Sequence, residues 1–218
     1  MRPQRGVAWR RLPPNAYSMA PSVRALSSEG LRSVLLEELE AEDAGLLEQT
    51  VSTLEAEMEA AGKKIKVSQE PGSARVEIEF VGKNAIASFD CRDVVPREEY
   101  DEEKPDDDEE PNSYEFELEV KNKDEKTIVF ECQAQENTTI TINSVSYYKS
   151  SDLKEDATVY DAPNFDELDP RLQAALYSYV EAIGCDAGFA NVVATLAQQK
   201  ESAEYYNWLT NLKDFLPK

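Results

Sequence analysis

The pattern of apolar and polar positions divides the chain into a helical part, a part with strand periodicity and a second helical part. Residues 29–61 carry apolar side chains at three- and four-residue spacing, which predicts amphipathic helix. The run Asp43-Ala44-Gly45 favours a break or a bend in this helix, and Gly62 is typical of a helix end. From residue 63 to about residue 160, apolar residues alternate with polar ones instead.

Six segments follow this period of two, and turns such as Pro71-Gly72 and Gly82-Lys83-Asn84 separate them. A seventh strand near Thr158–Tyr160 is a further candidate. The pattern predicts an antiparallel sheet with one wet, acidic face. The six segments are 65–67, 76–80, 87–91, 114–120, 128–132 and 140–147.

The last quarter of the chain, residues 169–216, predicts two helices. Asp169-Pro170 supplies an N-cap followed by proline at the first helical position, and Gly184 supplies the stop. A second helix is expected from about Asp186. The order of helix, strands and helices predicts a single α+β domain over residues 29–218, with its helices on one face of the sheet.

Charge separates the N-terminus from the rest of the chain. The first 28 residues hold five arginines and no acid, whereas residues 29–218 hold 18 basic and 44 acidic side chains, a net charge of −26. A segment that is rich in arginine and serine and free of acids is typical of a mitochondrial transit peptide, although a basic tail would have the same composition. We therefore expect residues 1–28 to direct the protein to the mitochondrial matrix.

The acidic remainder sets the kind of partner. Its field repels phosphate backbones and attracts proteins rich in arginine and lysine, in a manner that salt weakens. Ten acids fall between residues 98 and 110, opposed only by Lys104. This segment is our candidate partner-binding site; a solvated connection kept for solubility and a weak, non-specific calcium site stay open as alternatives. The ten acids are Glu98, Glu99, Asp101, Glu102, Glu103, Asp106, Asp107, Asp108, Glu109 and Glu110.

Catalytic and metal-binding patterns are missing from the sequence. It has no histidine, no P-loop, no GxSxG and no GxGxxG, and Cys91, Cys132 and Cys185 form no CxxC pair and predict buried thiols. We expect no cofactor, no metal and no catalytic site, with a hydrolase that uses paired carboxylates left as an alternative. The sequence contains no run of 18 apolar residues, so it predicts no transmembrane helix.

Apolar and aromatic residues gather near the C-terminus, at Tyr205, Trp208, Leu209 and Phe215. Packing within the monomer is the default interpretation of such a stripe. An oligomer interface is the alternative, because a domain built on one sheet leaves apolar helix surface to cover.

The C-terminal part also carries a resemblance. The segments Tyr160–Asp169, Leu172–Leu176, Tyr179–Gly184 and Lys200–Leu216, together with the order of parts over residues 29–216, resemble the mitochondrial acidic matrix protein family, also called the mitochondrial glycoprotein family. The resemblance implies a highly twisted seven-stranded antiparallel sheet flanked by one N-terminal and two C-terminal helices, in a doughnut-shaped homotrimer. The helical stretch Leu46–Ala61 departs from the family by its length.

The resemblance further implies a chaperone or adaptor for basic proteins, many of them RNA-binding, with no direct sequence-specific binding of nucleic acid. Such a protein would act on mitochondrial RNA processing, including RNA editing where a lineage relies on it, on translation or on ribosome assembly. A trimeric scaffold for assembly of a mitochondrial complex is the competing hypothesis.

Overall fold

The computed structural model describes residues 28–42, 45–95, 112–135, 140–150, 153–154, 160 and 162–217. The predicted transit peptide lies almost wholly outside these residues, and so do the ten acids between 98 and 110. The chain divides into two compact units, a larger one of residues 44–205 and a smaller one that combines residues 1–43 with 206–218.

Two helices replace the single N-terminal helix that the resemblance implied. α1 spans Ser28–Ala41 and α2 spans Leu46–Ala60, so the break expected at Asp43-Ala44-Gly45 separates them. The end of α2 follows the prediction as well. Gly62 takes a φ of +79°, and its N–H donates to the carbonyl of Glu59 at 2.9 Å. A positive φ is easily adopted only by glycine, which is why the helix stops here.

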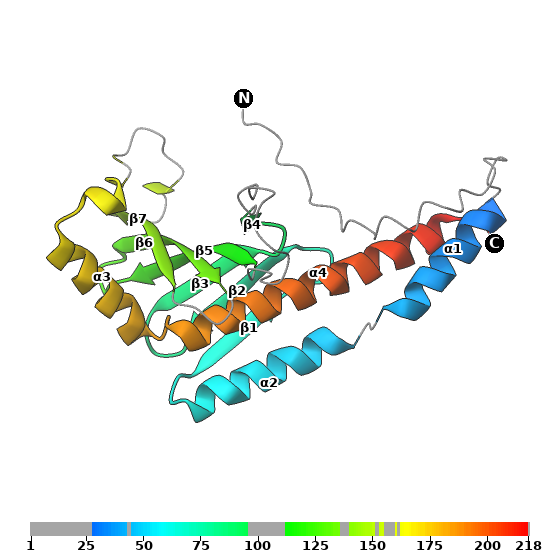
Figure 1. Ribbon diagram of the computed structural model, residues 1–218, viewed down its shortest axis with the longest axis horizontal. Helices are drawn as coiled ribbons and strands as arrows, with labels where there is room; N and C mark the ends of the chain where they lie inside the picture. Colours follow the sequence, from blue (N-terminus) through cyan, green and yellow to red (C-terminus); the bar gives the residue numbers. More distant parts are fainter. Residues whose placement is uncertain are drawn as a thin grey trace, which may run out of the picture. The chain divides into compact units, whose positions relative to one another are not determined.

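The larger unit is built on a seven-stranded antiparallel sheet (Figure 1). Six strands follow the order β1-β2-β3-β5-β6-β7, and the two-residue β4 pairs with the start of β5. The seventh strand therefore lies at Val94–Val95. Of the candidate near Thr158–Tyr160, two residues lie outside the described part and Tyr160 is in no strand. The strands are β1 Ile65–Gln69, β2 Arg75–Phe80, β3 Ala85–Asp90, β4 Val94–Val95, β5 Ser113–Lys121, β6 Thr127–Gln135 and β7 Thr141–Tyr148.

The core lies between the inner face of the sheet and the helices α2, α3 (Pro170–Ile183) and α4 (Ala187–Phe215) (Figure 1). Phe189 of α4 is fully buried, and its ring centroid lies 4.9 Å from that of Phe80 and 5.8 Å from that of Phe116. The alternation predicted from the sequence supplies this face, because every second residue of β2 and β5 is buried, whereas β3 and β6 also bury some consecutive residues. The inner face carries Val76, Ile78, Phe80, Ala87, Phe116, Leu118, Phe130 and Cys132.

The predicted boundaries of α3 are confirmed. The side chain of Asp169 accepts a hydrogen bond from the N–H of Arg171 at 2.8 Å, and Pro170 occupies the first helical position. Gly184 ends the helix with a φ of +129°, and a Cβ at this position would stand 3.2 Å from the ring of Phe80. Gly184 is therefore required both by the backbone conformation and by the aromatic core beside it.

A lysine is buried within the larger unit. Lys200 of α4 has no exposed surface, and its ammonium group donates to the side-chain oxygen of Gln69 at 2.8 Å and to the carbonyl of Glu70 at 2.7 Å. Glu204, one helical turn further on, supplies the counter-charge. The residue joins α4 to the end of β1. Sequence patterns did not single it out.

Candidate partner-binding surface

The outer face of the sheet, opposite the helices, carries most of its acids on β2, β5 and β6. Because the inner residues of these strands alternate with Glu77, Glu79, Glu117, Glu119 and Glu131, all five carboxylates point to the outer face. The predicted acidic face is thus present in the structure. The strand register aligns the outer residues in two rows across the sheet. One row is Ser68, Glu77, Ser88, Glu117, Glu131 and Ser144, and the other is Lys66, Glu79, Ile86, Glu119, Val129 and Ser146.

The first row places two like charges side by side. Glu117 of β5 and Glu131 of β6 are direct register partners, an arrangement that destabilises a sheet unless a cation or a hydrogen bond compensates. Both are compensated here. The hydroxyl of Ser144 donates to Glu131 Oε2 at 2.8 Å, and the ammonium group of Lys154 lies 2.6 Å from Glu117 Oε2 and 4.0 Å from Glu119 Oε2.

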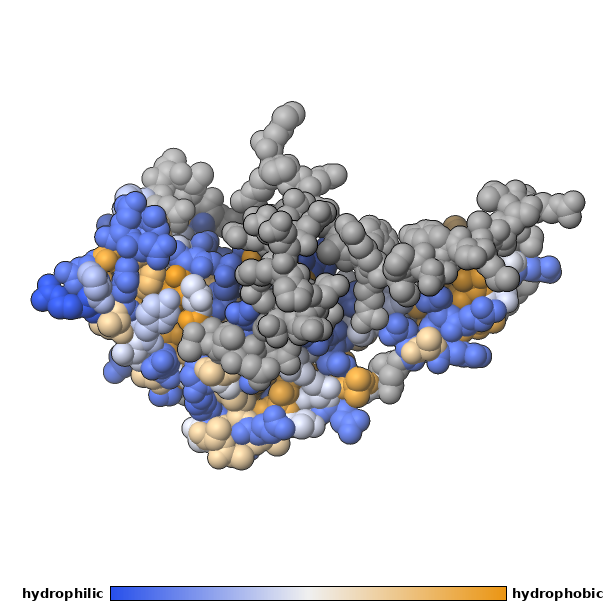
Figure 2. All heavy atoms as spheres, viewed as in Figure 1, coloured by the Kyte–Doolittle hydropathy of each residue, from blue (hydrophilic) through white to orange (hydrophobic). Residues whose placement is uncertain are grey.

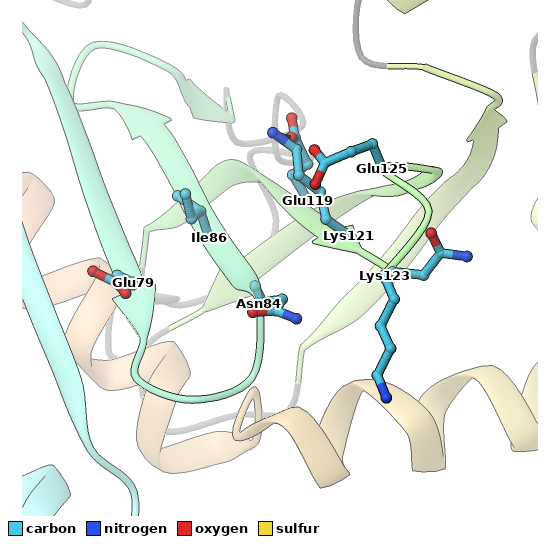
Figure 3. Close-up of a pocket in the computed structure, with 9 residues that line it drawn as sticks. Glu79, Asn84, Ile86, Glu119, Lys121, Lys123 and Glu125 are labelled. Carbon is cyan, nitrogen blue, oxygen red and sulfur yellow. Dashed lines mark ion pairs between the residues drawn. The ribbon is translucent and has the colours of Figure 1, made fainter.

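A shallow hollow opens at Glu79, Ile86 and Glu119 in the second row (Figure 3). Ile86 forms its apolar floor with 41% of its surface exposed, and Glu79 and Glu119 are its register partners on either side. Lys121 donates to Glu119 at 3.0 Å, which raises the pKa of the lysine. The side chain of Glu79, by contrast, makes no hydrogen bond or ion pair with the described residues, although its backbone belongs to the sheet. The lining is completed by Ala85 at the start of β3 and by four residues of the two adjoining turns, Asn84, Asn122, Lys123 and Glu125.

This arrangement suits a basic side chain. The aliphatic stem of an arginine or lysine can lie on Ile86 while its charged end reaches the carboxylate of Glu79, which has no competing partner. A phosphate would meet like charge at the same place. The sequence predicted an acidic face but not this hollow, because the hollow depends on which strands are neighbours and in which register.

The acidic segment itself lies outside the described residues, but both of its attachment points are described. The chain leaves the sheet after Val95 of β4 and returns at Ser113 of β5, and these two residues are direct register partners. The ten acids between 98 and 110 are therefore held at both ends on one edge of a strand pair.

The predicted interface residues Tyr205, Trp208, Leu209 and Phe215 all lie on α4, but they differ in exposure. Phe215 is 86% exposed and Trp208 is 54% exposed, whereas Tyr205 is partly buried and Leu209 is 2% exposed within the single chain. The sequence could not tell the exposed residues from the buried ones, because all four are apolar or aromatic.

In the smaller unit, Arg32 of α1 donates to the carbonyl of Leu216 at 2.9 Å, and Leu35 is buried. Three other apolar residues of α1, Leu31, Val34 and Leu36, are exposed, and Figure 2 shows apolar patches among hydrophilic residues over this helix. Such exposed apolar positions on a short helix are typical of a contact surface.

Clusters of potential metal ligands and reactive thiols are the groups that bear on catalysis. They contain no group of three histidine, cysteine or acidic residues that is placed to hold a metal ion. The three cysteines are free and buried, as predicted. Burial raises the pKa of Cys91 to about 11 and that of Cys132 to about 12, and it raises the pKa of Cys185 as well. Thiols in this state are poor nucleophiles, because the thiolate is the reactive form.

No single helix in the described part of the chain is long and apolar enough to cross a membrane. The pair α3 and α4, which meet at a bend of 66°, passes the same test of length and composition when the two helices are taken together. The apolar residues in the first half of α4 are used in the core, where Phe189, Val193 and Leu196 are buried.

Comparison with known proteins places the chain. A model of the mitochondrial glycoprotein family, MAM33, matches residues 35–216. An uncharacterized mitochondrial protein of Arabidopsis thaliana is 31% identical over 97 residues, which cover 44% of this chain and 38% of that protein. The mitochondrial acidic protein mam33 of Schizosaccharomyces pombe is 39% identical over 57 residues, which cover 26% of this chain and 21% of the relative. The matched regions thus span less than half the length of these relatives.

Two solved structures share the fold. A Leishmania major protein of unknown function, described as a homologue of human p32, superposes with a TM-score of 0.61 over 87% of this chain and 99% of its own, at 17% identity. The Trypanosoma brucei p22 protein superposes with a TM-score of 0.62 over 88% of this chain and 100% of its own, at 19% identity. At these identities the likeness concerns the fold. Together with the family match over most of the chain, it establishes that this acidic protein belongs to the mitochondrial glycoprotein family.

Proposed function

We propose that this protein is a non-enzymatic adaptor of the mitochondrial matrix that holds basic proteins, many of them RNA-binding, and so acts in mitochondrial RNA processing or translation. The observation that carries the proposal is the hollow beside Ile86, where a carboxylate without an internal partner adjoins an exposed apolar floor. The net charge of −26 over residues 29–218 supports it, because that charge attracts basic proteins and repels nucleic acid.

The acidic residues between 98 and 110 belong to the same proposal. Attached beside β5, they would add long-range attraction to the specific contacts that the outer face makes, and neutralising them should slow association more than it speeds dissociation. The absence of enzymatic activity is part of the proposal too. It is supported by a sequence without histidine and by three buried cysteines with raised pKa values.

Affinity capture tests the function. The chain from Ser28 onward is used as bait in mitochondrial lysate, with and without ribonuclease, and bound proteins are eluted with increasing salt and identified by mass spectrometry. Recovery of arginine- and lysine-rich proteins that survive ribonuclease and elute at moderate salt is expected. Recovery of only neutral proteins, or of proteins that are lost with the RNA, would contradict the adaptor function.

The second candidate is a homotrimeric scaffold, and a separate observation favours it. The exposed apolar residues of α1 and the exposed Phe215 would be covered if the smaller unit contacted other copies of the chain. The two functions are compatible, because an adaptor with several copies of one acidic face gains avidity for partners with several basic segments. Light scattering of the purified chain measures the oligomeric state directly.

A further inference from the structure

Lys154 follows β7 in the chain but contacts the acidic face at β5, a strand that does not neighbour β7. The chain leaves the sheet after Tyr148 at the end of β7, and six residues later Lys154 contacts Glu117 of β5. In the sheet order, β6 separates β7 from β5, so the lysine crosses one whole strand to reach its partner. Next to Lys154, the N–H of Leu153 donates to the carbonyl of Ser150 at 3.1 Å.

We propose that Lys154 is a built-in competitor for the basic partners of this protein. Its ammonium group occupies the carboxylates of Glu117 and Glu119, which a partner's arginine would otherwise use, and partner binding displaces it. The proposal rests on the adaptor function and adds a form of regulation to the same surface. Glu119 belongs both to this contact and to the hollow beside Ile86, so the competitor and the hollow share a residue.

The ion pair between Lys154 and its acids is accessible to solvent and can exchange. The side chain of Lys154 keeps 29% of its surface exposed and those of Glu117 and Glu119 keep 39% and 25%, so water and ligands can reach all three. Ion pairs that are exposed to this degree are weak enough to exchange. Attachment close to the end of β7 nevertheless keeps the lysine at a high effective concentration beside its acids, so a partner must bind well to displace it.

The competitor also sorts partners by chemistry. Lys154 contributes a single point charge, whereas a guanidinium group can form two parallel hydrogen bonds to one carboxylate. Arginine-rich segments are therefore expected to displace Lys154, and isolated lysines are not. Because Glu117 faces Glu131 directly, a cation beside Glu117 stabilises the row whether Lys154 or a partner supplies it, which links displacement of Lys154 to partner binding.

Binding of a fluorescent nona-arginine peptide to the full chain, measured by anisotropy, tests the proposal. Lys154→Gln should tighten binding about two- to fivefold by freeing Glu117, the range expected for loss of a partly exposed competing ion pair, whereas Glu119 keeps its pair with Lys121. Lys154→Arg should bind nona-arginine as the wild type does, or more weakly. Lys64→Gln, which makes the same charge change at an exposed pair with Glu59, is the matched control and should alter affinity less than Lys154→Gln does.

A second measurement needs no substitution. Acylation of lysines in the wild-type chain, followed by peptide mapping, should show faster modification of Lys154 when nona-arginine is bound, with Lys64 as the internal reference. Equal affinities of the Lys154→Gln and Lys64→Gln variants, or unchanged acylation of Lys154 in the complex, would overturn the competitor while leaving the adaptor function standing. Failure of every variant to bind nona-arginine would overturn both.

Discussion

The ammonium group of Lys200 lies 2.5 Å from Oε1 of Glu204, one helical turn further along α4, and the lysine has no exposed surface. The second oxygen of Glu204 accepts a hydrogen bond from the N–H of Gly72 at 2.8 Å. The pair thus fastens α4 to the turn between β1 and β2. A buried lysine must have its N–H groups hydrogen-bonded, and here the ammonium group donates to oxygens of Gln69, Glu70 and Glu204.

Lys200→Met should therefore lower the free energy of unfolding by about 2 kcal/mol, because it leaves the partly buried oxygens of Gln69, Glu70 and Glu204 without their cation. Urea denaturation measures the loss. The double variant Lys200→Met with Glu204→Leu should recover part of it, since removal of both charges leaves no uncompensated carboxylate. A single variant as stable as the wild type would show that the buried pair contributes nothing.

Gly184 and Gly62 both end helices at positive φ, but only Gly184 faces the aromatic core. Gly62→Ala should cost about 1 kcal/mol, from backbone strain alone, because nothing lies within 4 Å of the added Cβ. Gly184→Ala should cost about 2–4 kcal/mol, because the methyl group also presses on Phe80. Chemical denaturation of the two variants side by side gives the comparison, and equal losses would remove Phe80 from the explanation.

The buried thiols make stability fall at alkaline pH. Above the usual thiol pKa of 9.0 the unfolded chain releases its thiol protons, while folded Cys132 holds its proton to about pH 12 and Cys91 to about pH 11. The folded state then binds more protons, so each thiol lowers stability by at most about 1.4 kcal/mol per pH unit across this window. Urea denaturation from pH 8 to pH 10.5 under reducing conditions should show a shallower decline for Cys132→Ala than for the wild type. Parallel curves would contradict the assignment.

The hollow beside Ile86 should contribute to the binding of basic peptides. Glu79→Gln and Ile86→Ser are each expected to weaken nona-arginine binding about two- to fivefold, because the first removes the carboxylate and the second the apolar floor. Glu48→Gln makes the same charge change as Glu79→Gln on the exposed surface of α2 and serves as its control. Equal effects of Glu79→Gln and Glu48→Gln would mean that only net charge matters.

Self-association should depend on exposed residues of the smaller unit. Phe215→Ser is expected to shift the chain toward lower oligomers at a given concentration without lowering its melting temperature at high dilution, because Phe215 is 86% exposed within one chain. Leu209→Asp should instead destabilise the chain itself, since Leu209 is buried. Light scattering and thermal denaturation separate the two effects. An unchanged oligomeric state for Phe215→Ser would exclude this residue from the interface.

The alternating residues of β2 and β5 were enough to predict two strands, their buried sides and the acidic face, because a period of two admits a single arrangement of inward and outward side chains. The strand Val94–Val95 was not predicted, because two residues are too few to show a period of two. Asp169 and Gly184 were predictable for a different reason: each satisfies a local requirement of a helix end, which depends on few neighbours.

The hollow, the buried lysine and the contact of Lys154 could not be predicted in the same way. Each depends on residues that are distant in sequence: Glu79 and Glu119 belong to different hairpins, Lys200 meets the end of β1, and Lys154 crosses β6. Their positions follow from strand order and register, which local patterns do not contain. Lys200 would ordinarily be assigned to solvent, because a lysine on a helix is rarely buried.

The pairing of Val95 with Ser113 has a consequence for how members of this family can diverge. Because the two ends of the acidic connection belong to paired strands, the pairing of β4 with β5 does not depend on how many residues lie between them. The free energy of closing a connection grows with the logarithm of its length, about 0.6 kcal/mol for each doubling. Residues can be gained, lost or exchanged there with little effect on folding. Partner preference can therefore change by insertion and deletion at this one place while the scaffold stays the same.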